Sequence, residues 1–130
     1  TNKRTLAAAD FFTGLYETAL APGELVTSVS FPIPQAAAYQ KFQQPASRFA
    51  LVGVFVARTA QGVRCAVTGA GSGVFRSSVI EQALGARFDA SALENVSIAA
   101  ADLNSDIHAS AAYRAHLIKV LAQRAVAAIA

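Results

Sequence analysis

The sequence predicts an α+β fold: an antiparallel sheet of three to four strands, with about three helices, mostly C-terminal, covering one face. Strand-like segments are concentrated in the first half of the chain, and helical periodicity dominates the second half. Short turns link the strand-like segments, and short turns join antiparallel neighbours. The 130 residues suffice for one domain and are too few for two, so we expect a single domain over residues 1–130.

Four segments of the first half have strand patterns. In order they are residues 24–31, 37–43, 50–58 and 63–68. The first alternates between two faces, which predicts a strand with one half-buried face that ends at the prolines 32 and 34. The third is continuously apolar, which predicts a central strand buried on both sides. The fourth alternates again after the turn at Gln61–Gly62.

Helical signals flank these strands. Residues 5–14 predict a short helical turn with Phe11 and Phe12 packed inward. Ser78–Glu81 and Ser91–Glu94 have capping-box spacing, in which a hydroxyl and a carboxylate satisfy two free amides. The last helix is expected from about residue 110 to 128, because apolar residues recur there at helical spacing. That apolar stripe consists of Tyr113, Leu117, Val120, Leu121, Ala125 and Ala128.

Composition limits the class of protein. Hydrophobic residues make up 54% and charged residues 15%, which argues against disorder. No apolar run reaches the roughly 18 residues that span a bilayer, and no secretory signal is visible. Cys65 is the sole cysteine, so no internal disulfide can form. These features fit a reducing compartment, and we expect a cytoplasmic protein with no membrane span.

Several kinds of site find little support. The net charge is +3, but no basic run is interleaved with aromatic residues, so no nucleic-acid surface is expected. His108 and His116 have no cysteine or acidic pair at ligand spacing, so surface or capping histidines are favoured over a metal site. Residues 69–73 are glycine-rich but lack the lysine of a phosphate-binding loop, which favours a flexible strand exit. No catalytic residue is predicted.

The segment from Tyr39 to Val54 is the most informative. Lys41 and Phe49 flank a short loop, held between two expected strands. A cation and an aromatic ring placed together could hold a flat, electron-poor, partly anionic ring. The alternative is a hairpin with a solvated lysine and a core phenylalanine, which spacing alone favours.

Four segments together resemble a known family. They are Ala9–Gly14, Leu20–Leu25 with Phe31–Pro32, Tyr39–Val54, and Ser110–Arg114 after Asp106. In this order and spacing they are similar to the C-terminal domain of the flavoprotein (medium) subunit of molybdenum hydroxylases. That family includes carbon monoxide dehydrogenase and xanthine dehydrogenase, and the resemblance covers nearly the whole chain.

The resemblance implies a role in electron transfer. FAD would be held mostly by a preceding FAD-binding domain that this chain lacks, and this domain would cover part of the isoalloxazine ring. Electrons would pass from molybdenum through the clusters of an iron–sulfur subunit to FAD and an acceptor, with a molybdopterin subunit as the other partner. By itself the chain is expected to be inactive and not to retain FAD. The competing hypothesis is a non-catalytic structural or assembly domain of a multisubunit complex.

The resemblance also places individual residues near the flavin. Val26 falls where the family has an aliphatic residue against the ring, and Lys41 falls on a lysine near the ring. Phe49 falls on an aromatic beside the ring, which is a tyrosine in carbon monoxide dehydrogenase. Arg48 stands where many members have an acid, and Gln44 where many have a basic residue. We therefore expect Val26, Lys41, Arg48 and Phe49 to contact the cofactor in the complete subunit.

Overall fold

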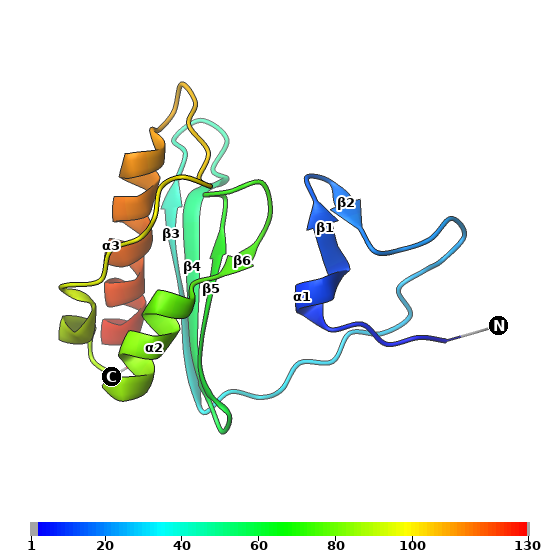
Figure 1. Cartoon of the computed structure of the whole chain (residues 1–130), viewed down its shortest axis with the longest axis horizontal. Helices are drawn as coiled ribbons and strands as arrows, with labels where there is room; N and C mark the ends of the chain where they lie inside the picture. Colours follow the sequence, from blue (N-terminus) through cyan, green and yellow to red (C-terminus); the bar gives the residue numbers. More distant parts are fainter. Residues whose placement is uncertain (1–2, 130) are drawn as a thin grey trace.

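The computed structural model of the protein describes residues 3–129, and it confirms the α+β class. The elements are α1 (Ala8–Phe11), β1 (Phe12–Gly14), β2 (Glu17–Thr18), β3 (Ala36–Gln43), β4 (Ala50–Thr59), β5 (Gly62–Thr68), β6 (Phe75–Arg76), α2 (Ser78–Ala86), the 3-10 turn η1 (Ala90–Leu93) and α3 (Ala111–Ile129). Figure 1 shows the helices α2 and α3 on one side of a sheet, with the N-terminal part of the chain on the other side.

The main sheet has the strand order β3-β4-β5-β6, and every neighbouring pair is antiparallel. The expected strands over residues 37–43, 50–58 and 63–68 are all confirmed within one residue at each end. The β4–β5 turn places Gly62 at φ 110°, a conformation that residues with a Cβ rarely adopt. Short connections of this kind explain why consecutive strands lie side by side.

Strand β4 is the centre of the core. Val52, Val54 and Val56 are fully buried beneath the helical layer. On the opposite face Leu51, Gly53 and Ala57 are also buried, whereas Phe55 is 41% exposed, so the prediction of a strand buried on both sides fails at Phe55. We call this opposite surface the open face. It consists of Tyr39, Lys41, Gly53, Phe55, Ala66, Thr68 and Arg76, which the strand register brings to one side.

Helix α3 covers β3 and β4 with an apolar stripe, as expected, but the stripe is rotated from the predicted one. Leu117, Leu121 and Ala125 are buried as predicted, whereas Tyr113 is 43% exposed and Ala128 faces solvent. The buried residues of the helix are Arg114, Ala115, Leu117, Ile118, Leu121, Ala122, Ala125 and Val126. Among the described residues, no helix combines the length and apolarity needed to cross a membrane.

Both predicted capping boxes are wrong. Helix α2 takes Ser77 as its N-cap without a side-chain cap bond, one residue before the predicted hydroxyl. The turn η1 is capped by Asp89, whose carboxylate accepts the amide of Ser91. Glu81 instead turns toward the sheet, where it accepts the amide of Cys65 at 2.9 Å and pairs with Arg76. The carboxylate therefore ties α2 to strands β5 and β6.

This tie predicts an acid-dependent loss of stability. Burial alone would raise the pKa of Glu81, but hydrogen bonds from Arg76 and the Cys65 amide outweigh it and lower the pKa below 4.5. A lowered folded-state pKa contributes stability above the unfolded value and loses it as the pH falls through the folded value. Glu81→Gln should therefore be less stable at neutral pH, and its unfolding free energy should fall less below about pH 4.5.

Urea unfolding of both proteins between about pH 7 and pH 3 measures this effect. Glu94→Gln is the matched control, because Glu94 is exposed at the end of η1. Parallel pH profiles for wild type and Glu81→Gln would contradict the assignment of this bond to stability.

The N-terminal part, residues 3–35, differs most from expectation, and we call it the arm. Its helix is only Ala8–Phe11, and Phe12 begins a small β1–β2 hairpin with its side chain 53% exposed rather than packed inward. Residues 24–31 form no strand in this structure, so that prediction is wrong here. The segment has a strand pattern, but no neighbouring strand among the described residues supplies its hydrogen bonds.

Candidate functional site

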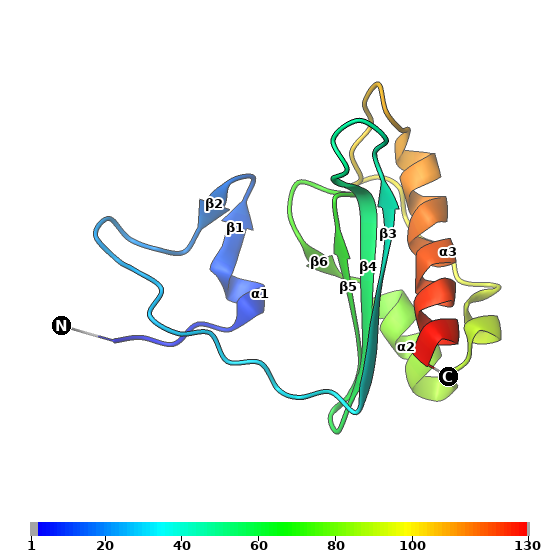
Figure 2. The same ribbon diagram turned by 180° about the vertical axis from the view of Figure 1, so that it is seen from behind.

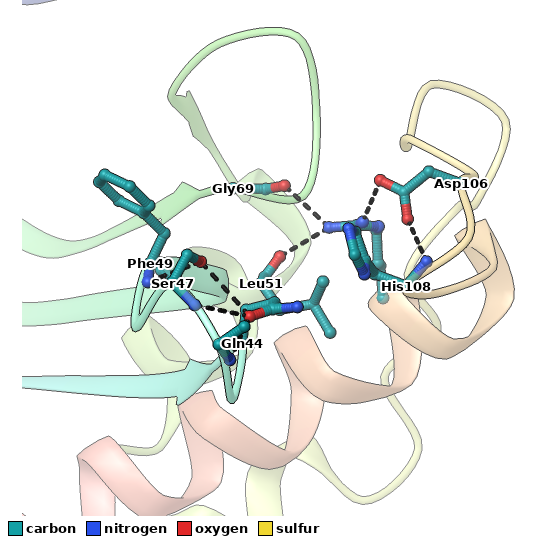
Figure 3. Close-up of a pocket in the computed structure, with 10 residues that line it drawn as sticks. Gln44, Ser47, Phe49, Leu51, Gly69, Asp106 and His108 are labelled. Carbon is teal, nitrogen blue, oxygen red and sulfur yellow. Dashed lines mark hydrogen bonds and ion pairs between the residues drawn. The ribbon is translucent and has the colours of Figure 1, made fainter.

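The loop between β3 and β4, residues 44–49, is ordered by one side chain. The Gln44 side-chain oxygen accepts the amides of Ala46 at 2.6 Å and Ser47 at 2.9 Å. The backbone of Gln44 also pairs with Arg48 and Phe49, donating to Phe49 O and accepting from Arg48 N. Figure 3 shows Gln44 and Ser47 together beneath Phe49. The side chain and the backbone of Gln44 therefore both serve to close the loop.

Lys41, Arg48 and Phe49 are brought together, as the sequence predicts. Lys41 Nζ lies 3.4 Å from the carbonyl oxygen of Arg48 and donates a long hydrogen bond to it. Arg48 adopts a left-handed backbone, with φ 65°, which is strained for a residue with a long side chain. The strain persists because the bonds around Gln44 determine the loop.

Phe49 is not a core residue. Its side chain is 78% exposed, and Figure 3 shows the ring directed away from Asp106 and His108. The alternative hypothesis of a core phenylalanine is therefore wrong. The exposed ring on this hydrogen-bonded loop leaves apolar surface that another group can cover.

One position of the open face, Gly53, carries no side chain. Gly53 lies opposite Lys41 in the β3–β4 pair and opposite Thr68 in the β4–β5 pair. A side chain at Gly53 would collide with the hydroxyls of Tyr39 and Thr68, so Tyr39 lies across the sheet where the glycine leaves room.

Val26 is not brought to these residues. It lies in the arm, 53% exposed and outside any helix or strand. Figures 1 and 2 both show the arm standing away from the β3–β4 loop. The expected contact of Val26 with the cofactor remains a prediction for the complete subunit.

A buried arginine supports this end of the sheet. Arg114, 3% exposed, donates from Nη1 to the carbonyls of Leu51 at 2.7 Å and Gly69 at 3.0 Å. Its Nη2 donates to Asp106 Oδ2 at 2.7 Å, an interaction that is also an ion pair. The guanidinium therefore joins α3 to the start of β4, to the end of β5 and to the segment before α3.

Asp106 organises the segment around this arginine. Its carboxylate accepts the amides of His108 at 2.9 Å and Ala109 at 3.1 Å. These backbone hydrogen bonds first, and Arg114 second, hold the pKa of Asp106 below its ordinary value. A cavity of about 330 Å³ lies between this cluster and the β3–β4 loop. Its lining residues are Gln44, Ala46, Ser47, Phe49, Ala50, Leu51, Gly69, Asp106, His108 and Arg114.

The sequence held a signal for Arg114 that we missed. Arg114, Ile118 and Leu121 recur at spacings typical of one helix face, so a charged residue stands on the buried stripe. Such a charge needs partners, and here they are backbone carbonyls and Asp106.

The structure requires a glycine at position 69, although the glycine-rich sequence around it predicted only a flexible strand exit. Its φ is +75°, and a side chain there would collide with the carbonyl of Ala50. Among residues 3–129, no group of three or more His, Cys, Asp or Glu side chains is placed to hold a metal ion.

The β3–β4 loop combines charge with exposed aromatic surface. Lys41 and Arg48 supply positive charge, and Phe49 supplies an exposed aromatic ring. This arrangement can cover a planar anionic group, and in a water-excluding interface its charges would act strongly.

The chain is similar to known proteins over most of its length. Residues 37–129 match the family of the CO dehydrogenase flavoprotein C-terminal domain. The carbon monoxide dehydrogenase medium chain of Afipia carboxidovorans is 28% identical over 95% of this chain and 47% of its own length. The nicotine 6-hydroxylase medium subunit of Paenarthrobacter nicotinovorans is 34% identical over 95% of this chain and 47% of its own length.

Solved structures show the same fold. CO dehydrogenase from Oligotropha carboxidovorans superposes with a TM-score of 0.83 at 28% identity, covering 98% of this chain and 50% of that one. Quinoline 2-oxidoreductase from Pseudomonas putida 86 superposes with a TM-score of 0.76 at 26% identity, covering 97% of this chain and 48% of that one. The chain spans about half the length of the curated relatives it matches. On the match over residues 37–129, the chain belongs to the CO dehydrogenase flavoprotein C-terminal domain family.

Proposed function

We propose that this chain is the C-terminal domain of the flavoprotein subunit of a molybdenum hydroxylase. In the complete subunit it covers one side of the isoalloxazine ring of FAD and takes part in passing electrons from iron–sulfur clusters through FAD to an acceptor. The partners of that subunit are an iron–sulfur subunit, a molybdopterin subunit and the FAD-binding domain. The complex acts in the cytoplasm, and the chain by itself does not retain FAD.

The observation that carries the proposal is the placement of Lys41 and Phe49. Lys41 bonds the loop that presents Phe49, and Phe49 is 78% exposed immediately before β4. The ring of Phe49 exposes apolar surface that a partner can cover, and the ammonium of Lys41 attracts negative charge. A flat ring with an anionic edge satisfies both.

FAD, when bound, supplies a two-electron carrier whose ring becomes more negative on reduction. The Lys41 ammonium stabilises that extra negative charge more than it stabilises the neutral oxidised ring. Phe49 excludes water from the same region, which lowers the local dielectric and strengthens the effect of Lys41. Lys41 therefore raises the flavin reduction potential, and Phe49 holds the ring in place.

Lys41→Met in the complete flavoprotein subunit should lower the flavin potential by roughly tens of millivolts, because ~30 mV corresponds to ~1.4 kcal/mol for a two-electron couple. Thermal stability should change little, because Lys41 is exposed and makes one long hydrogen bond. Phe49→Ala should release FAD more easily and leave it more accessible to solvent. A redox titration with thermal melts and FAD release rates on the same samples measures all three quantities.

Lys41→Arg and Lys119→Met are the controls. The first keeps the charge and should keep most of the potential, whereas the second removes a charge from α3, where Lys119 donates to Glu94 O at 2.7 Å. An unshifted potential in Lys41→Met, with FAD still bound, removes Lys41 from the site.

The alternative function is a non-catalytic structural or assembly domain. It predicts that Phe49→Ala changes subunit assembly and leaves the flavin potential and FAD release untouched. Size-exclusion chromatography of the same variants therefore separates the two functions.

A further inference from the structure

One oxygen atom holds the first half of the β3–β4 loop. The side-chain oxygen Oε1 of Gln44 accepts the amide of Ala46 at 2.6 Å and the amide of Ser47 at 2.9 Å, and it also accepts the Ser47 hydroxyl at 3.4 Å. Figure 3 shows Gln44 beside Ser47, joined by dashed lines. Three donors from two consecutive residues therefore converge on one acceptor, as in the side-chain turns that order short loops.

The backbone of Gln44 holds the second half of the loop. Its amide donates to the carbonyl of Phe49, and its carbonyl accepts the amide of Arg48, both at 2.9 Å. Arg48 has φ 65°, and this left-handed conformation sets the direction of its own carbonyl group. One residue thus fixes both halves of the loop, from Ala46 to Phe49.

The carbonyl of Arg48 is in turn the group that holds Lys41. Nζ of Lys41 donates to this oxygen at 3.4 Å, and Lys41 takes part in no ion pair within residues 3–129. A carboxylate in this place would cancel much of the charge of the ammonium, whereas a carbonyl is neutral. The bond therefore orients the ammonium and leaves its positive charge free to act on another group.

The effect of that charge depends on where it lies. Lysine carries its ammonium on a flexible four-carbon stem, and a Coulomb interaction weakens as the distance grows. A hydrogen bond to a carbonyl in a fixed position narrows the range of distances that Lys41 can adopt. The carbonyl of Arg48 keeps its position because Gln44 orders the loop around it.

We propose that Gln44 is a positioning residue for the flavin site. By ordering residues 45–49, it holds the Lys41 ammonium and the Phe49 ring where they act on the isoalloxazine. The inference rests on the proposed function, because it gives Gln44 a role only if Lys41 and Phe49 contact the flavin. The side chain of Gln44 acts through the loop backbone and needs no contact with FAD.

Hydrogen exchange in this chain by itself tests the ordering of the loop without any flavin. The amides of Ala46 and Ser47 should exchange about 10-fold faster in Gln44→Leu than in wild type, because leucine has a similar size and no acceptor. Gln44→Glu keeps an acceptor oxygen and should keep the slow exchange. Gln43→Leu is the matched control, since Gln43 is the exposed residue directly before Gln44. Equal exchange in wild type and Gln44→Leu overturns the proposal.

Redox titration of the complete flavoprotein subunit tests the action on the flavin. Gln44→Leu should lower the flavin potential by at least roughly half of the shift that Lys41→Met causes, and Gln43→Leu should leave it unchanged. In a Lys41→Met background, Gln44→Leu should lower the potential no further, because the charge that it positions is gone. A general loss of stability does not produce this non-additivity. Equal shifts in both backgrounds overturn the proposal.

The outcomes separate this inference from the proposed function. A shift in Lys41→Met with none in Gln44→Leu overturns the positioning role and leaves the proposed function standing. No shift in either variant contradicts the place of Lys41 in the flavin site and overturns this inference with it. If Gln44→Leu loses FAD too quickly for a titration, FAD release is compared with that of Phe49→Ala. Release that is no faster in the double variant supports the proposal, and an additive increase overturns it.

Discussion

Replacing Arg114 by Met is expected to lower the unfolding free energy of the chain by about 3–5 kcal/mol. The guanidinium is 3% exposed and donates to the carbonyls of Leu51 and Gly69, which lie within the packed end of the sheet. Methionine fills a similar volume but offers no donor, so both carbonyls lose their partner. Each unsatisfied buried group costs about 1–3 kcal/mol.

Urea unfolding of Arg114→Met measures the loss, with Arg124→Met as the control, because Arg124 is exposed on the same helix. Arg114→Lys should recover little, because an ammonium cannot reproduce the planar fork that bonds three oxygens. A loss for Arg114→Met as small as that for Arg124→Met would show that water replaces the guanidinium.

Leu121→Ala is expected to cost about 2–5 kcal/mol. Leu121 is 2% exposed, on the side of α3 that packs against β3 and β4. Truncation removes buried apolar surface and leaves a cavity that the β-sheet and the rest of the helix cannot fully close.

Thermal and urea unfolding measure this cost, and His116→Ala is the control, since His116 is exposed on the same helix. A loss for Leu121→Ala below roughly 0.5 kcal/mol would show that α3 does not depend on this stripe for docking.

The three central strands were predictable because local pattern and tertiary environment agree. Residues 50–57 are apolar throughout, and the strand they form has neighbours on both edges. The turn at Gln61–Gly62 leaves no room for a crossover, so β4 and β5 had to pair antiparallel. By contrast, β6 has only two residues and carries no pattern to recognise.

The helix ends were not predictable from spacing. The pairs Ser78–Glu81 and Ser91–Glu94 have the separation of a capping box, but a carboxylate can accept hydrogen bonds from any donor that the fold places near it. Glu81 finds the amide of Cys65 and the guanidinium of Arg76, which only the folded sheet places there. The buried stripe of α3 differs from the predicted one for a similar reason. Arg114 lies on the buried side of the helix, where a charged residue is not expected from the sequence pattern.

The amino-acid sequence was enough to predict the α+β class, the paired strands β3, β4 and β5, and the closeness of Lys41 to the loop that carries Phe49. These features depend on residues that are close together in the sequence, namely on the periodicity of apolar residues, the turn residues and the short loop between β3 and β4. Tertiary packing sets the exposure of Phe49, the closing of its loop by Gln44, and the joining of distant segments by Arg114. It also left residues 24–31 unpaired, because a strand exists only where a second strand supplies its hydrogen bonds.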